Sequence, residues 1–168
     1  MLISTSRGNE DDACSEAWFL LGEIGDRESL VEKTKILGLT VAKTILDPFK
    51  VVEAFRRILG ERPEEFRYNL RVIPVELVVR TDLDEVKEAV ARLSSKILES
   101  ETFRVTVEKR HTTLSTSEVI EAVAADIDKK VDLENPDKVI LIEVLGRLTG
   151  VSVIRPMDVL SVAKERLI

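Results

Sequence analysis

The stretch that decides the fold is KKVDLENPDKVILIEVLGRLTGVSVI, residues 129–154. Its centre, VILIEVL at 139–145, is apolar at almost every position, which is typical of a strand covered on both faces. Asn135-Pro136-Asp137 before this strand has turn chemistry, and Gly146 after it indicates a hairpin into a second strand at 148–154. The C-terminal third is therefore predicted to hold a central strand with a hairpin partner.

The residues around this stretch predict the rest of the second half. TFRVTVEKR at 102–110 alternates apolar and polar positions and predicts a strand. Apolar residues at helical spacing predict helices over 83–99, 115–130 and 157–167. Two pairs have the spacing of a capping box, Asp82 with Glu85 and Ser115 with Glu118. Residues 81–168 are therefore predicted to form one α+β domain whose order is helices, strand, helix and two strands.

The first half predicts a second domain over residues 1–80. Strands are expected at 2–6, 29–36, 39–45 and 71–80, and helices at 10–24 and from Asp47-Pro48 to Gly60. Pro74 lies inside the last of these strands and indicates an edge position or a bulge. The resulting order, β-α-β-β-α-β, is that of the ferredoxin-like fold, and the whole chain is an α+β protein.

Composition places the chain among globular proteins of a reducing compartment. It is 44% hydrophobic and 33% charged, and no apolar run approaches the roughly 20 residues that cross a membrane. The start, MLISTSRGNEDD, reaches acidic residues too early for a secretory signal, and Cys14 is the single cysteine. We therefore expect a cytoplasmic protein without membrane contact. The absence of Gln beside three Asn is typical of a thermophile.

The charge balance argues against a strongly basic nucleic-acid module. The formal net charge is −6, and both halves are acidic, with 12 basic and 14 acidic residues in 1–80 and 13 and 17 in 81–168. Any RNA site must then be a local patch on an acidic protein.

A catalytic constellation does not emerge from the sequence. His111 is the single histidine and Cys14 the single cysteine, so the common zinc ligand sets are missing, and there is no glycine-rich nucleotide loop. Glu76 and Glu143 lie inside strands and could act as acids or bases, with a cross-strand structural role as the alternative. We expect no catalytic residue, no metal and no cofactor.

Basic clusters are the candidates for ligand binding. RPEEFRYNLR at 62–71 interleaves arginines with Phe66 and Tyr68, which suits unpaired RNA or, alternatively, a loop whose aromatic rings join the core. Lys109-Arg110-His111 precedes a Thr/Ser-rich loop and a helix N-terminus, where an anion could bind. Arg7-Gly8-Asn9 could present amides to a phosphate or form a plain turn. The predicted RNA contacts are Arg67, Tyr68, Arg71, Arg104, Lys109, Arg110, Arg147 and Arg155.

Several motifs resemble the THUMP domain, an RNA-binding module of tRNA-modifying proteins. They are TFRVTVEKR, STSEVIEAVAADI, KKVDLENPDKVILIEV and GVSVI, and VDL-x-NPD between a helix and an apolar strand is the most specific. The first half, with LISTSRGNE, LLGEIGD, LDPF and FRYNLRVIPVE, resembles the ferredoxin-like domain of the stand-alone THUMP adaptor. That resemblance covers nearly the whole chain.

The resemblance implies a tRNA-binding adaptor that presents tRNA to a separate acetyltransferase for cytidine N4-acetylation. The alternative within the same resemblance is an adaptor for thiolation or methylation by another enzyme. Two readings from other classes remain at this point: a small hydrolase or transferase using Glu76 or Glu143, and a domain that binds only proteins. The acidic net charge favours a model in which the partner enzyme supplies some of the RNA contacts.

Overall fold

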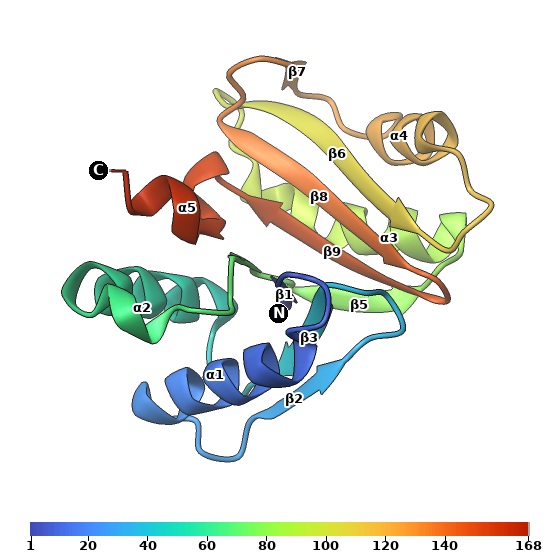
Figure 1. Ribbon diagram of the computed structural model, residues 1–168. Helices are drawn as coiled ribbons and strands as arrows, with labels where there is room; N and C mark the ends of the chain where they lie inside the picture. Colours follow the sequence, from blue (N-terminus) through green and yellow to red (C-terminus); the bar gives the residue numbers. More distant parts are fainter. Residues whose placement is uncertain (168) are drawn as a thin grey trace. The chain divides into compact units, whose positions relative to one another are not determined.

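The computed structural model describes residues 1–167, and this part of the chain is a mixed α+β structure with two five-stranded sheets and five α-helices (Figure 1). It divides into two compact units. The first comprises Met1–Pro74 and the segment that starts at Asp158, and the second comprises Val75–Met157. These units divide at a different place from the expected boundary between residues 80 and 81. No described helix has the length and apolar character that a membrane crossing requires.

The first unit is built on a sheet with the strand order β10-β4-β1-β3-β2, in which every neighbouring pair is antiparallel. Its strands are β1 (Leu2–Ser4), β2 (Leu30–Lys33), β3 (Leu39–Lys43), β4 (Arg71–Ile73) and β10 (Leu160–Ser161). Its helices are α1 (Glu10–Glu23), α2 (Pro48–Glu61) and α5 (Val162–Glu165), with a 3-10 turn, η1, at Pro63–Glu65. Up to Ile73 the elements follow the order β1-α1-β2-β3-α2-β4, as the sequence predicts.

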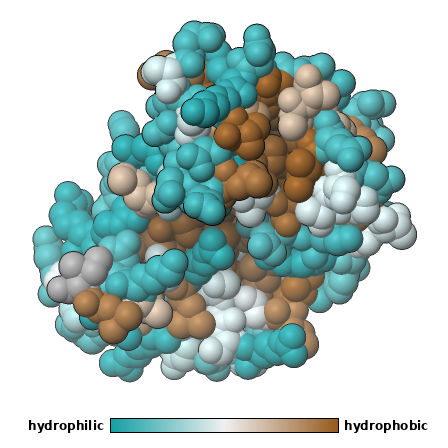
Figure 2. All heavy atoms as spheres, turned by 90° about the horizontal axis from the view of Figure 1, so that it is seen from above, coloured by the Kyte–Doolittle hydropathy of each residue, from teal (hydrophilic) through white to brown (hydrophobic). Residues whose placement is uncertain are grey.

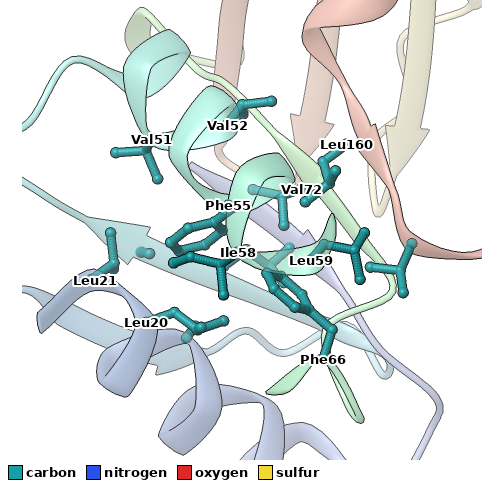
Figure 3. Close-up of a cluster of buried hydrophobic side chains, with 14 residues drawn as sticks. Leu20, Leu21, Val51, Val52, Phe55, Ile58, Leu59, Phe66, Val72 and Leu160 are labelled. Atoms are coloured by element: carbon teal, nitrogen blue, oxygen red, sulfur yellow. The ribbon is translucent and has the colours of Figure 1, made fainter. Parts of the chain in front are cut away.

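The core of the first unit lies between α1, α2 and the sheet. Asp47 caps α2 as predicted, because its carboxylate accepts hydrogen bonds from the amides of Phe49 and Lys50. The helix then buries Val51, Val52, Phe55, Ile58 and Leu59 against Leu20 and Leu21 of α1 (Figure 3). It continues through Gly60 to Glu61, so the expectation that Gly60 ends the helix is wrong.

The strand predicted over 71–80 is in fact two strands in two different sheets. In β4, Ile73 pairs with Leu2 in the sheet of the first unit. In β5 (Leu77–Arg80), Leu77 pairs with Val151 in the sheet of the second unit. Pro74 separates them because it has no amide hydrogen with which to continue a ladder. The proline thus marks the change from one unit to the next.

The second unit has the strand order β5-β9-β8-β6-β7, with β8 at the centre as predicted. Its other strands are β6 (Thr102–Arg110), β7 (Lys130–Val131), β8 (Lys138–Leu145) and β9 (Leu148–Ile154). Its helices are α3 (Leu83–Leu93) and α4 (Thr116–Ala124), and its 3-10 turn is η2 (Ser94–Lys96). A further 3-10 turn, η3 (Pro156–Asp158), spans the residues at which the chain passes from the second unit to the first. Both helices pack against one face of the sheet, where Ile140, Ile142 and Val144 of β8 are buried. β6 runs parallel to β8, and β8 runs antiparallel to β9.

Both helices of the second unit are shorter than predicted. α3 ends at Leu93 and not near residue 99; after it, the hydroxyl of Ser94 donates to the carbonyl of Ala91 at 2.8 Å, which competes with helical bonding. α4 ends at Ala124 and not near residue 130. Residues 130–131 instead form β7, which pairs with β6. Pairing with a distant strand therefore overrides the local helical pattern there.

The predicted C-terminal helix over 157–167 is wrong in extent and in place. Only Val162–Glu165 is α-helical, and the preceding residues form η3 and β10. Leu160 of β10 pairs with Val72 of β4 and is fully buried in the core of the first unit. Burial of this leucine outweighs the helical periodicity, so the tail that the sequence assigns to the C-terminal domain belongs to the first unit.

Asp26 is a buried carboxylate that ties α1 to the segment before α2. It is 1% exposed and accepts hydrogen bonds from the hydroxyl of Thr44 and from the amides of Ile45 and Glu28. The hydrogen bond from Thr44 is the largest cause that holds the pKa of Asp26 below its ordinary value, and the Ile45 amide adds to it. The carboxylate form is therefore favoured in the folded state.

We expect Asp26→Asn to lower the free energy of unfolding at pH 7 by about 2 kcal/mol. The stabilisation by a depressed carboxyl pKa is present above the unfolded pKa and is lost as pH falls through the folded pKa. The difference between wild type and variant should therefore shrink in urea titrations as pH is lowered from 6 to 3. Asp128→Asn, at an exposed position, is the control. A difference that does not change with pH would contradict this role of Asp26.

Candidate nucleic-acid interface

The second unit carries an open groove of about 980 Å³ at one edge of its sheet. β6 and β8 run in parallel, so they end at the same edge, and β5 ends beside the hairpin that joins β8 to β9. Ligands commonly bind where parallel strands end, because the following loops meet there. The lining residues are Arg80, Thr81, Asp82, Glu85, His111, Thr112, Thr113, Gly146, Arg147 and Leu148.

The chain turns sharply at His111, directly after β6. His111 has a φ of 56°, in the left-handed region that residues other than glycine rarely adopt. The neighbouring hairpin is tied to this turn, since the amide of Gly146 donates to the carbonyl of Arg110 at 2.8 Å. The imidazole is exposed at the rim of the groove.

Arginines and carboxylates alternate along the groove. The Arg80 Nε donates to Glu85 at 2.6 Å, and this hydrogen bond is the main cause that lowers the pKa of Glu85 and raises that of Arg80. Glu85 also accepts from the Arg80 amide at 3.0 Å, so it does not complete the predicted capping box with Asp82. Asp82 alone caps α3. Arg147, exposed at the hairpin turn, is therefore the arginine of the groove best placed to meet an anion.

Threonine hydroxyls complete the groove. The Thr81 hydroxyl lies 2.9 Å from that of Thr149, and the Thr112 hydroxyl accepts from the amide of Leu114 at 3.3 Å. Thr113 is exposed. Hydroxyl groups beside arginine and histidine can donate to phosphate and ribose oxygens, which fix the position of a nucleic acid without reading its sequence.

The structure separates Lys109 from Arg110, which the sequence places in one patch. Successive side chains of a strand point to opposite faces. The Lys109 Nζ donates to the carbonyl of Leu114 at 3.1 Å, at the start of α4. The Arg110 guanidinium instead forms an ion pair with Glu143 at 2.7 Å, and the Glu143 side chain is 3% exposed. Arg110 is therefore held by the sheet and is not directed to the α4 N-terminus.

The N-terminus of α4 is already capped by its own residues. The predicted capping box is confirmed, because the Ser115 hydroxyl accepts from the Glu118 amide while the Glu118 carboxylate accepts from the Ser115 amide. The Ser115 amide is the main cause that lowers the pKa of Glu118 below its ordinary value. A carboxylate thus sits where the sequence suggested an external anion.

The remaining predicted contacts of the second unit lie apart from one another. The Arg104 guanidinium donates to the carbonyl of Leu133 at 3.0 Å, so it holds the VDLENPD loop. Arg155 follows β9 and is exposed, at the opposite end of that strand from Arg147. The structure therefore brings Arg147 into the groove and leaves the other predicted contacts outside it.

The 62–71 cluster of the first unit is largely committed to internal contacts. Phe66 is buried and meets Phe55 edge-on, with ring centroids 5.9 Å apart, so its ring joins the core. The Glu16 carboxylate accepts from the amides of Arg67, Tyr68 and Asn69 at 2.8–3.0 Å. The Arg67 guanidinium donates to the carbonyl of Glu64, and Tyr68 is half-buried. Arg71, which lies on β4 in the same cluster, is exposed and so remains accessible to a ligand.

The Arg7-Gly8-Asn9 turn is likewise filled by a side chain of the protein. The Glu10 carboxylate accepts from the amides of Gly8 at 2.9 Å and Gly38 at 2.7 Å. The bond from Gly38 is the main cause that lowers the pKa of Glu10. The carboxylate thus takes amides that the sequence suggested for a phosphate.

The two carboxylates that the sequence places inside strands have structural partners. Glu143 lies in β8 as predicted, but the placement of Glu76 is wrong, because it lies between β4 and β5. Glu76 accepts from the Lys96 ammonium at 2.6 Å and from the Val153 amide at 2.9 Å, which joins η2 to β9. Glu143 pairs with Arg110. Among the described residues, no group of three His, Cys, Asp or Glu side chains is placed to hold a metal ion.

Residues 80–154, which contain the groove, match the THUMP domain pattern, so a THUMP domain is present in this chain. An uncharacterized protein of Schizosaccharomyces pombe is 28% identical to this chain over 121 residues, which are 67% of this chain and 42% of that protein. The chain thus spans about two-fifths of the length of that relative.

Three solved structures share the fold over nearly the whole chain. PH1313 from Pyrococcus horikoshii aligns with a TM-score of 0.69 at 16% identity. The aligned region covers 92% of this chain and 54% of the PH1313 chain. A 4-thiouridine synthetase crystallised with RNA and ATP has a TM-score of 0.61 at 19% identity, covering 92% and 40%. TrmN from Thermus thermophilus has a TM-score of 0.58 at 18% identity, covering 93% and 46%. The similarity includes both units and not the THUMP domain alone.

Arg80 is the groove residue that the sequence analysis missed. Arg80 is the last residue of β5 and comes just before Asp82, the cap of α3. A single arginine does not indicate a binding site in a sequence where positive and negative charges are mixed throughout. Only the pairing of β5 with β9 places Arg80 opposite Leu148, beside Arg147. The signal in the sequence that indicates Arg80 is its position as a cation at the end of a predicted strand.

Proposed function

We propose that this protein binds tRNA through the THUMP groove and takes part in tRNA modification. The observation that carries this proposal is the THUMP domain at residues 80–154. The 4-thiouridine synthetase of the same fold, which was crystallised with RNA, supports it. In the groove, Arg147 and His111 would meet phosphates, and the threonine hydroxyls would meet phosphate or ribose oxygens.

The specific role that we propose is a non-catalytic, cytoplasmic adaptor that presents tRNA to a separate acetyltransferase for cytidine N4-acetylation. The motif resemblance, from LISTSRGNE to GVSVI, supports this role, and it extends to a ferredoxin-like first unit. The carboxylates Glu76 and Glu143 are paired with Lys96 and Arg110, which favours a binding protein over an acid-base enzyme. The alternative is an adaptor for thiolation, which the fold of the 4-thiouridine synthetase supports, or for methylation.

The charge of the protein sets the expected strength of tRNA binding. The groove combines Arg80 and Arg147 with Asp82 and Glu85, and the formal net charge of the chain is −6. Few phosphates can be neutralised by such a surface, so the affinity of the isolated chain should be weak and its dependence on salt shallow. A basic partner enzyme would raise the affinity by adding phosphate contacts.

Arg147→Ala is expected to weaken tRNA binding by about three- to tenfold for every tRNA alike and to reduce the salt slope by about one. The reason is the loss of one phosphate contact that carries no sequence information. Fluorescence anisotropy with labelled tRNA at 50 and 200 mM salt measures both quantities. Arg92→Ala is the matched control, because Arg92 is an exposed arginine of the same unit on α3, outside the groove.

Equal affinities for the two variants would remove the groove from the proposal, and the absence of any tRNA binding at 50 mM salt would overturn the RNA-binding role. The modification itself is tested by reconstitution. Purified tRNA cytidine acetyltransferase should form N4-acetylcytidine faster with this chain than without it. Stimulation of a thiolation or methylation enzyme instead would select the alternative.

A further inference from the structure

The first unit exposes two adjacent aromatic side chains on α1. Trp18, the single tryptophan of the chain, is 54% exposed, and Phe19 is 46% exposed. Hydrophobic side chains elsewhere on the surface are to be expected, and Figure 2 shows such patches within a mostly hydrophilic face. An adjacent Trp-Phe pair differs from these, because large aromatic side chains are the typical anchors of protein interfaces.

These rings play no part in the core of the first unit. α1 buries Ala13, Ala17, Leu20 and Leu21, which form its core-facing stripe. Trp18 and Phe19 lie on the remaining face of the helix and are in neither buried cluster. Burying the exposed parts of both rings against a partner would remove further apolar area from water.

Small residues lie beside the two rings along α1. Ser15 lies three and four residues before the pair, and Gly22 lies four and three residues after it, so small residues border both rings along the helix. A Cβ on Gly22 would meet nothing within 4 Å. Glycine is therefore not required there by packing within the chain, although it is a poor helix residue compared with alanine. The exposed parts of both rings are thus bordered by small residues at these positions, which leaves them open to a partner.

The charged side chains of α1 itself are all acidic. α1 contains Glu10, Asp11, Asp12, Glu16 and Glu23 and no lysine or arginine. Glu10 and Glu16 are bound to backbone amides of the chain, while Asp11, Asp12 and Glu23 are exposed. Lys33 pairs with Asp11, and Arg62 pairs with Glu23, but no described cation pairs with Asp12. A surface of this charge repels the phosphates of RNA and attracts lysine and arginine.

We propose that the Trp18–Phe19 face of α1 is the docking surface for the tRNA-modifying enzyme, and that the enzyme offers an apolar pocket with a basic rim. This inference rests on the proposed function for the identity of the partner. The acidic rim selects the protein over the RNA as the occupant, and the two rings supply the anchors. In this proposal α1 of the first unit binds the enzyme, and the groove of the second unit binds tRNA.

The test measures two affinities of the same variants. Trp18→Ala/Phe19→Ala should weaken binding to purified tRNA cytidine acetyltransferase by at least about thirtyfold, the size expected for loss of two interface anchors. Asp12→Lys should slow association and make it less sensitive to salt. Biolayer interferometry gives both results. Leu37→Ala/Ile45→Ala is the matched control, because these apolar side chains of the first unit are 70% and 86% exposed.

The second measurement is tRNA binding by the same variants, which should stay within about twofold of wild type. A loss of tRNA affinity with unchanged enzyme binding would show that the rings stack on RNA bases and would overturn the docking surface. So would equal enzyme binding by the double variant and its control, or a wild-type chain that binds no enzyme. Self-association abolished by the variant would make the face an interface between copies of this chain and would overturn it too.

Failure of the docking surface and failure of the proposed function give different results. If tRNA binding at the groove persists while no enzyme binds α1, the RNA-binding function stands and the docking proposal fails. If the enzyme binds through Trp18 and Phe19 while tRNA does not bind, the docking surface stands and the proposed tRNA function fails. Thermal unfolding of each variant confirms that these exposed substitutions leave the fold intact.

Discussion

Arg110→Ala is expected to lower the free energy of unfolding of the second unit by about 3 kcal/mol. The Arg110 guanidinium pairs with Glu143 at 2.7 Å, on the strand next to it, and the Glu143 side chain is 3% exposed. Removing the arginine takes a 2.7 Å ion pair from a buried carboxylate, which costs far more than losing a surface pair. Urea unfolding followed by circular dichroism measures the change.

Lys109→Ala is the control for this prediction, since Lys109 is the neighbouring cation of the same strand and is exposed. It should change the stability by less than about 0.5 kcal/mol. A double-mutant cycle with Glu143→Ala should give a coupling of at least about 1 kcal/mol between the pair. Additive effects would show that Arg110 stabilises the sheet by packing and not by the ion pair. Because Arg110→Ala is expected to destabilise the second unit, its tRNA affinity must be measured well below its unfolding temperature. A loss of affinity then reflects binding and not unfolding.

Phe55→Ala is expected to destabilise the first unit by about 4 kcal/mol. Phe55 of α2 is fully buried, and its ring meets Phe66 edge-on. It lies in the cluster of buried side chains that includes Leu20 and Leu21 of α1 (Figure 3). The substitution loses the free energy gained by moving the ring from water into the core. It also leaves a cavity, because the surrounding side chains can move only partly into the vacated space. Chemical unfolding followed by the fluorescence of Trp18 on α1 reports on this unit.

Phe19→Ala makes the same chemical change on the exposed face of α1 and serves as the control. It should cost less than about 0.5 kcal/mol, because the ring is already 46% exposed and contributes no core contact. Equal destabilisation by the two variants would mean that Phe19 packs against the unit after all. That result would also remove the argument that α1 presents free aromatic anchors to a partner.

The candidate site shows where sequence patterns mislead. A run of cations such as Lys109-Arg110 suggests one patch, but adjacent strand residues face opposite ways and here meet different partners. A turn with open amides, Arg7-Gly8-Asn9, suggests a phosphate site, but the Glu10 carboxylate accepts from the amides of Gly8 and Gly38 and fills it. Internal carboxylates thus take positions that look available in the sequence.

The sequence by itself determined the elements whose pattern is local. The caps at Asp47 and Ser115 and the strands at 102–110 and 148–154 follow from contacts within a few residues or from strict alternation. Only the tertiary structure decided which sheet receives each strand. It split 71–80 at Pro74 and sent Leu160 back to the first unit, because pairing and burial with distant strands outweigh local propensity. It also assembled the groove from Arg80, His111 and Arg147, which are dozens of residues apart in the chain.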